Sequence, residues 1–286
     1  MNFSSLSFFD SADGKLAWAQ SGSGVPVVFL HPTPLDHRYW LPLQAHLRGI
    51  QAILPDLRGH GASELGERLT AGGFAAVPDA PVLTMERLAQ DVLALLDHLE
   101  IPEAVFVGCS IGGYVLLELW RQAPDRMRGL AFVCSKAQPD AAANAARRAA
   151  TIAQAREGKR EELFEVMAQS LTGASSRARR PEIVAELRST MTLTAEALAA
   201  VQAGLATRPD SLPTIETIEA PVLAIAGGED AGVTPAEMQA FFAAPGGCEF
   251  HLLSDAGHLA AFEQPEKVGG LLAAWLRQFQ AEDLSR

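Results

Sequence analysis

Six near-continuous apolar segments recur along this chain and are separated by stretches with helical periodicity. Continuous apolar runs, unlike alternating ones, are typical of strands that are covered on both faces, as in a parallel sheet. Parallel neighbours need long crossover connections, and helices supply them. The pattern therefore predicts an α/β protein with a doubly wound, mostly parallel sheet. The six runs are residues 25–31, 51–57, 103–108, 128–134, 220–228 and 248–253.

Two weaker β-prone segments, FSSLSFF and KLAWAQS, come first in the chain and are separated by Asp13 and Gly14. A short turn between such segments predicts an antiparallel pair. Apolar residues at helical spacing predict helices over residues 84–99, 111–122 and 265–280, the first with Thr84 as its N-cap.

The stretch 136–212 lacks a convincing strand and has the periodicity of several successive helices, one of which places Leu163, Val166, Met167 and Leu171 on a shared face. Because it lies between two predicted strands, the sixth and seventh, we expect a helical cap over the carboxyl edge of the sheet, where open α/β sheets bind ligands. A purely structural decoration is the alternative. The expected domains are a core of residues 1–135 and 213–286 and a cap of residues 136–212, with a long loop at 64–83.

The charge balance excludes some functions. Lys and Arg total 23 against 34 Asp and Glu, a net charge of −11, which opposes binding to a nucleic-acid backbone. No apolar run approaches the ~18 residues of a membrane helix, and the N-terminus has no signal-peptide pattern, so a cytoplasmic location is expected. The three cysteines, Cys109, Cys134 and Cys248, form no CxxC pair. We therefore expect reduced thiols, no metal and no cofactor.

The segment VGCSIGGY contains a GxSxG pentapeptide, Gly108 to Gly112, between an apolar strand and a helical pattern. In this context a tight strand-to-helix turn exposes the serine hydroxyl, and glycines two residues before and after it avoid collisions with backbone. Ser110 is therefore the candidate nucleophile. Cys109 could be mistaken for one, but a small buried residue is the interpretation favoured by its place in the turn.

A serine hydroxyl needs a base within hydrogen-bond reach, and the base needs an orienting acid. Two histidines follow Ser110: His251 lies within a strand, whereas His258 lies in a Gly-containing loop after the last strand, which favours His258 as the base. For the acid, Asp230 in a turn after a strand is favoured over its neighbour Glu229 and over Asp255.

An oxyanion hole must complete such a site, usually as two backbone N–H groups. One donor is expected to be the N–H of Ile111, directly after the nucleophile. The other is expected from the loop HPTPLDHRYW after the first apolar run.

Taken together, the segments LHPTPLDHRYW, LPDLRGHGAS, VGCSIGGY, GGEDAGVTP and DAGHLAAFEQP resemble the α/β-hydrolase superfamily over nearly the whole chain. The resemblance implies an α/β-hydrolase fold, the triad Ser110, Asp230 and His258, and oxyanion donors at Ile111 and Thr33. His31-Pro32 replaces the family's usual His-Gly, and Pro32 has no N–H to donate. By analogy with relatives, Thr33-Pro34 is a candidate cis peptide.

Several neighbouring residues have other expected roles. His37 and Trp40 follow the oxyanion loop and, with Cys109, are candidates to line a substrate pocket. Arg58 and His60 lie in the loop after the second apolar run, where structural hydrogen bonds are favoured.

The resemblance is strongest to the branch of enol-lactonases and carboxylesterases, with 3-oxoadipate enol-lactonase as a member. It implies a serine hydrolase acting on a small carboxylic ester or lactone without a cofactor. Cofactor-free perhydrolases and haloperoxidases with the same triad are one alternative, and a ligand-binding module with little turnover is another.

Overall fold

A computed structural model describes residues 5–67 and 69–283. Its centre is an eight-stranded sheet in the order β1-β2-β4-β3-β5-β6-β7-β8. Strand β2 is antiparallel to its neighbours, and the pairs from β4 to β8 are parallel. The strands are β1 (Ser7–Ser11), β2 (Gly14–Gly22), β3 (Val25–Leu30), β4 (Ile50–Pro55), β5 (Ala104–Cys109), β6 (Met127–Val133), β7 (Val222–Gly227) and β8 (Cys248–Leu253).

The predicted doubly wound, mostly parallel sheet is confirmed, and each of the six apolar runs overlaps one strand, with bounds that differ by at most two residues. Every residue of β5 and of β7 is buried, as expected of strands covered on both faces. The antiparallel pair β1–β2 is also present, although the first residues of the segment FSSLSFF lie outside the described part.

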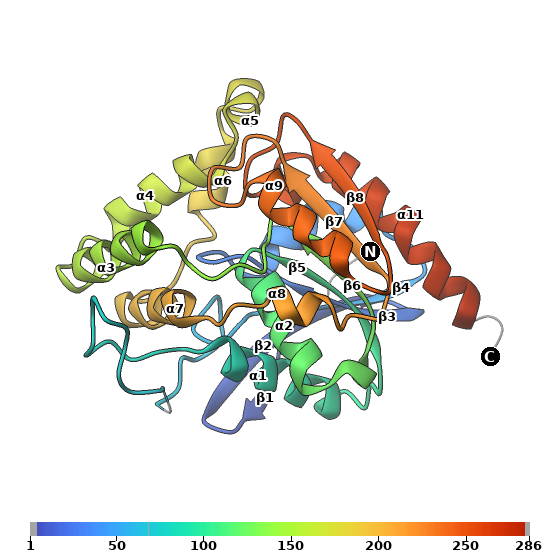
Figure 1. Ribbon diagram of the computed structural model, residues 1–286, viewed down its shortest axis with the longest axis horizontal. Helices are drawn as coiled ribbons and strands as arrows, with labels where there is room; N and C mark the ends of the chain where they lie inside the picture. The colour runs from blue at the N-terminus through green and yellow to red at the C-terminus, as the bar shows by residue number, and fades with distance from the viewer. Residues whose placement is uncertain (1–4, 68, 284–286) are drawn as a thin grey trace.

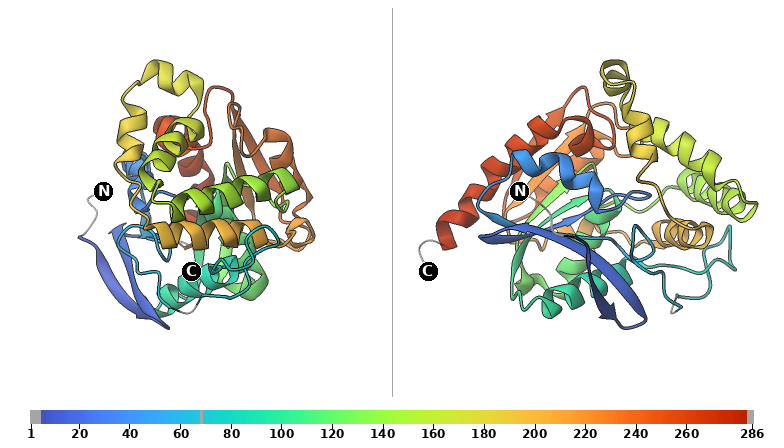
Figure 2. Two further views of the ribbon diagram at one scale, coloured as in Figure 1. Left: turned by 90° about the vertical axis from the view of Figure 1, so that its left-hand side faces the viewer. Right: turned by 180° about the vertical axis from the view of Figure 1, so that it is seen from behind.

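Helices cover both faces of the sheet (Figure 1). The 3-10 helix η1 (His37–Ala45) and α11 (Pro265–Asp283) lie together on one face, and α1 (Met85–His98) and α2 (Ile111–Gln122) on the other (Figure 2). The predicted Thr84 N-cap is confirmed, because its side chain accepts a hydrogen bond from the N–H of Arg87. Such a cap typically stabilises a helix by about 1 kcal/mol. Shorter elements are η2 (Pro124–Arg126), α9 (Pro235–Met238), η3 (Gln239–Ala243) and α10 (Ala260–Glu263).

The chain between β6 and β7 forms the predicted helical cap (Figure 1). Helices α3 and α7 pack side by side, and α4 packs on α6. The cap consists of α3 (Ala142–Arg156), α4 (Arg160–Leu171), α5 (Ala174–Arg179), α6 (Ile183–Arg188), α7 (Ala195–Thr207) and α8 (Leu212–Ile215). Within the described residues, no helix has the length and apolar character needed to span a membrane.

The expected apolar face of α4 is wrong in one position. Leu163 is buried, but Val166 is 65% exposed, and Phe164 and Ala168 are buried instead. The guanidinium groups of Arg160 and Arg188 lie over the Phe164 ring and cover it. The buried stripe is therefore rotated from the one that periodicity alone suggested.

Candidate active site

The turn that carries Ser110 has the geometry that its sequence predicts. Ser110 lies between β5 and α2 with φ 52° and ψ −117°, a left-handed conformation that side chains other than glycine rarely adopt. A Cβ on Gly108 would lie 2.5 Å from the backbone of Gly112, and one on Gly112 would lie 2.2 Å from the Leu30 carbonyl oxygen. Both glycines are therefore required by close backbone approach.

Ser135 also supports this turn, and the sequence analysis did not identify it. Its hydroxyl donates a hydrogen bond of 2.9 Å to the carbonyl oxygen of Ser110. A Cβ on Gly113 would lie 2.2 Å from the Ser135 hydroxyl oxygen. Gly113, the third glycine in VGCSIGGY, was the available signal, because it indicates that another group approaches this helix closely.

His258 and Asp230 meet at the carboxyl edge of the sheet. His258 Nδ1 lies 2.7 Å from Asp230 Oδ2, and both residues are buried. The other carboxylate oxygen of Asp230 accepts hydrogen bonds from the N–H groups of Gly232 (2.8 Å) and Val233 (2.9 Å). The carboxylate can only accept, so His258 Nδ1 carries the proton and Nε2 is left with a lone pair.

Burial and charge act in opposite directions on this pair. Burial lowers the pKa of His258, but the charge of Asp230 and its hydrogen bond raise it, and the net pKa lies above its ordinary value. Burial likewise raises the pKa of Asp230, while His258 and the two N–H donors lower it below its ordinary value. The pair is thus arranged to stabilise an imidazolium next to a carboxylate.

The loop of His258 lies against the end of the strand that leads into Ser110. The Sγ atom of Cys109 is 3.8 Å from the carbonyl oxygen of His258, and Cys134 Sγ is 3.5 Å from that of Gly257. Cys109 itself is fully buried, and burial raises the pKa of its thiol, which agrees with its interpretation as a small core residue. The turn of Ser110 and the loop of His258 are therefore neighbours in space.

The competing residues have other partners. Glu229 accepts hydrogen bonds from the N–H and the hydroxyl of Ser175 in the cap. Asp255 forms ion pairs with Arg179 and Lys267. His251 Nε2 lies 2.6 Å from Glu249 on the edge strand β8.

The loop that begins at His31, expected to supply an oxyanion donor, is held by two buried histidines. The N–H of Leu57 donates to His31 Nε2 at 2.9 Å, so His31 carries its proton on Nδ1, which faces the Pro32 carbonyl at 3.1 Å. The hydroxyl of Thr33 lies 2.9 Å from His60 Nε2. Burial lowers the pKa of both histidines, that of His60 to about 3, so both are neutral at pH 7.

Among the described residues, no acceptor is found for the backbone N–H of either expected oxyanion donor. Ile111 is the first residue of α2, where N–H groups have no acceptor within the helix. No acceptor for the N–H of Thr33 is found in the part of the chain that the structure describes. The bond Thr33-Pro34 is cis, as the resemblance implied.

His37 and Trp40 have structural contacts. His37 Nδ1 lies 2.7 Å from Asp56 Oδ1, and Asp56 also accepts the N–H of Ala62. Trp40 is 2% exposed and packs on Tyr39 and Phe29. These contacts favour a role in packing the loop over a role in lining a substrate pocket.

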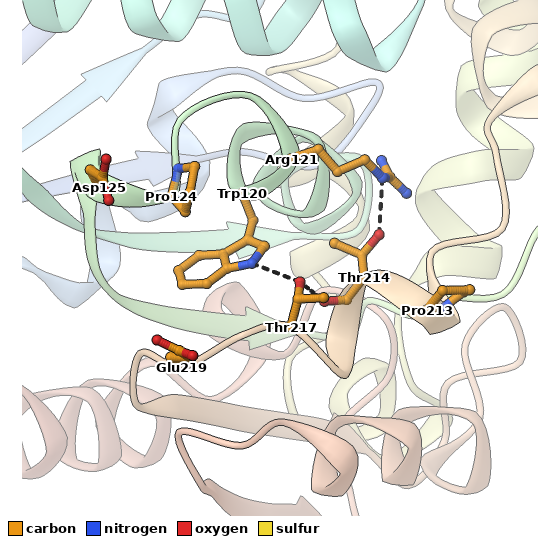
Figure 3. Close-up of a pocket in the computed structure, with 8 residues that line it drawn as sticks. All are labelled: Trp120, Arg121, Pro124, Asp125, Pro213, Thr214, Thr217 and Glu219. Carbon is orange, nitrogen blue, oxygen red and sulfur yellow. Dashed lines mark hydrogen bonds between the residues drawn. The ribbon is translucent and has the colours of Figure 1, made fainter.

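Two further places in the structure have features of a ligand site. Oxygen and nitrogen atoms of Asp36, His37 and Asp56 lie close enough together to hold a metal, but Asp36 already binds Arg38, and Asp56 binds His37. A hollow of about 530 Å³ lies beside the end of α2, where Trp120 Nε1 donates to Thr217 and Arg121 Nε to Thr214 (Figure 3). It contains none of the residues discussed above.

Known proteins resemble the chain over most of its length. Residues 27–270 match the model of the "Alpha/beta hydrolase family". A 3-oxoadipate enol-lactonase 2 of Acinetobacter baylyi is 30% identical over 240 residues, which are 79% of each chain. A thermophilic esterase of Thermogutta terrifontis is 30% identical with a TM-score of 0.85, covering 96% of this chain and 99% of its own. A bromoperoxidase of Bacillus anthracis, at 18% identity and a TM-score of 0.80 over 96% and 100% of the two chains, shares the fold.

Proposed function

Because the chain belongs to the alpha/beta hydrolase family, we propose that it is a serine hydrolase that cleaves a small carboxylic ester or lactone. The observation that carries this proposal is the backbone of Ser110. Its strained conformation between a buried strand and a helix holds the hydroxyl clear of the chain. Strain of this kind costs of order 1–3 kcal/mol and persists where the surrounding structure enforces it.

The mechanism assigns one step to each group. Ser110 Oγ attacks the substrate carbonyl while His258 Nε2 takes the hydroxyl proton, and Asp230 stabilises the resulting imidazolium. The N–H groups of Ile111 and Thr33 stabilise the negative charge that develops on the carbonyl oxygen. His258 then donates its proton to the leaving alcohol oxygen, which leaves an acyl ester on Ser110.

A water completes the cycle. His258, neutral again, takes a proton from the water as it attacks the acyl ester, and the proton then passes to Ser110 Oγ as the acid leaves. Every proton transfer uses the same nitrogen, because Nδ1 stays bonded to Asp230. With a lactone, the leaving alcohol stays attached to the product, and the steps are otherwise unchanged.

The substrate class is supported by the named relatives. One is named an enol-lactonase and another an esterase, each at 30% identity to this chain. Both names denote cleavage of a carboxylic ester bond, cyclic in the first case. An uncharged acyl group attacked by a serine is also the chemistry for which an oxyanion hole made of backbone N–H groups is suited.

The test is hydrolysis of p-nitrophenyl acetate and butyrate and of simple lactones by the purified protein. Ser110→Ala should lose at least ~10³-fold in kcat, the scale of triad removal. Ser170→Ala is the matched control, because this exposed serine on α4 bonds only to a carbonyl within its own helix. Equal rates for wild type and Ser110→Ala would contradict the proposal and favour a ligand-binding module.

A further inference from the structure

Glu263 is a buried carboxylate at the end of α10, with 6% of its surface exposed. Its Oε2 atom accepts hydrogen bonds from the N–H groups of Gly173 (2.9 Å) and Gly257 (3.0 Å), and its Oε1 atom accepts one from Leu259 (3.1 Å). Gly257 and Leu259 are the residues on either side of His258. Glu263 therefore binds the loop of the base at both flanks.

The same carboxylate joins this loop to the cap. Gly173 follows α4, and the carbonyl oxygen of Leu171, at the end of that helix, accepts the N–H of His258 itself at 3.0 Å. The two backbones are in direct contact, since a Cβ on Gly257 would lie 2.3 Å from the nitrogen of Gly173. The segment Leu171–Gly173 of the cap thus packs directly on the loop of His258, and Glu263 accepts hydrogen bonds from both.

The charge of Glu263 is needed for this arrangement. Burying a carboxylate is costly unless hydrogen bonds compensate it, and here three backbone N–H groups donate to Glu263. Three N–H donors satisfy the carboxylate, which has acceptors on both oxygens. A glutamine in its place would present an NH₂ group to at least one of these donors.

We propose that Glu263 is a positioning residue for His258, whose carboxylate fixes the loop of the base and ties that loop to the cap segment Leu171–Gly173. This inference rests on the proposed function for the role of His258. It means that the cap contributes to the orientation of the base as well as covering the site.

The charged groups around His258 agree with this role. Burial lowers the pKa of His258, as does Lys136, three residues after β6, whereas Asp230 and Glu263 raise it. The Cys109 thiol contacts the His258 carbonyl, and burial raises its pKa so that it stays neutral. Removing the charge of Glu263 while keeping its size should therefore lower the pKa of His258.

The experiment compares Glu263→Gln with Glu266→Gln, an exposed carboxylate in the first turn of α11. For Glu263→Gln we expect kcat on p-nitrophenyl butyrate to fall by about 10- to 100-fold, the scale of a small misplacement of a catalytic group. The acid limb of kcat/KM, and the His258 pKa measured by NMR on the free protein, should both move to lower pH. Glu266→Gln should match wild type in all three.

A folded Glu263→Gln that keeps the wild-type kcat, or that keeps the wild-type His258 pKa, would overturn the proposal. If this variant does not fold, amide hydrogen exchange of the wild type decides. The amides of Gly173, Gly257 and Leu259 should exchange far more slowly than solvent-exposed loop amides, and unprotected exchange would overturn the proposal. The NMR and exchange measurements need no turnover, so they remain informative if the proposed hydrolase activity is absent.

Discussion

His258 Nδ1 lies 2.7 Å from Asp230 Oδ2, a contact that joins two loops 28 residues apart in the chain. Each loop follows a strand, β7 for Asp230 and β8 for His258, and both strands end at the same edge of the sheet. The contact fixes the tautomer of the imidazole and leaves Nε2 free to accept a proton. The identity of the acid therefore has a direct consequence for activity.

Asp230→Asn should lower kcat by about 10³- to 10⁴-fold, because an amide in this position favours the wrong tautomer of His258. Asp255→Asn is the matched control, since Asp255 pairs with Arg179 and Lys267 away from the base. It should change kcat by less than about threefold, as expected for an exposed ion pair. Steady-state kinetics on p-nitrophenyl butyrate compares the two, and a larger loss for Asp255→Asn would assign the acid to that residue.

The pH profile reports the ionisation of His258. The base acts when neutral, so kcat/KM should rise with pH through the His258 pKa, which the charge of Asp230 holds above the ordinary value of 6.5. In the residual activity of Asp230→Asn, the acid limb of kcat/KM should move to lower pH. Without the charge of Asp230, burial dominates and lowers the pKa of His258. If the rise of kcat/KM in the wild type has its midpoint at or below pH 6.5, this account of His258 and Asp230 is contradicted.

The strands and the nucleophile turn could be predicted because their signals are local. Six apolar runs overlap strands β3 to β8, and the glycines around Ser110 mark a turn too tight for side chains. The buried face of α4 could not be predicted, because Phe164 is covered by Arg160 of its own helix and by Arg188 of α6, which is distant in the sequence. The hydrogen bonds to Glu263 could not be predicted for a related reason. Their donors are backbone N–H groups, and one of them is 90 residues away in the chain.

Gly112→Ala should destabilise the protein and abolish hydrolysis. Its Cβ would lie 2.2 Å from the Leu30 carbonyl oxygen, so backbone must shift, at a cost of about 1–3 kcal/mol in the free energy of unfolding. Gly270→Ala in α11 is the control, because its added Cβ would have no described neighbour within 4 Å beyond the backbone of its own helix. It should stabilise the helix by about 0.5–1 kcal/mol. Urea unfolding measures the free energy of unfolding of both variants. Equal changes would show that the turn at Gly112 can accommodate a methyl group.

The free energy of unfolding should decrease as pH is lowered, partly because of His60. Its pKa is about 3 in the folded protein and near 6.5 when unfolded, so the unfolded chain binds the proton first as pH falls. The contribution of His60 to the free energy of unfolding is complete above pH 6.5 and is lost as pH falls toward 3. The free energy of unfolding then changes by up to about 1.4 kcal/mol per pH unit. His31, with a lowered pKa, acts in the same sense, whereas His37 and His258, with raised pKa values, oppose it.

His60→Gln tests this assignment by comparing urea unfolding at two pH values between the folded and unfolded pKa. Glutamine keeps a donor and an acceptor for Arg58 and Thr33 but does not titrate. The variant should lose less stability than wild type over the same fall in pH. Equal losses would show that His60 does not contribute to the slope.

Covalent labelling tests the central claim most directly, because it asks which atom of the protein is nucleophilic. After incubation with a p-nitrophenyl phosphonate, intact-mass and peptide mass spectrometry should show one adduct per chain, located on Ser110. Ser110→Ala should remain unlabelled, and His258→Ala should react far more slowly than wild type. Labelling of Ser110→Ala at the wild-type rate, or an adduct on another residue, would contradict the account.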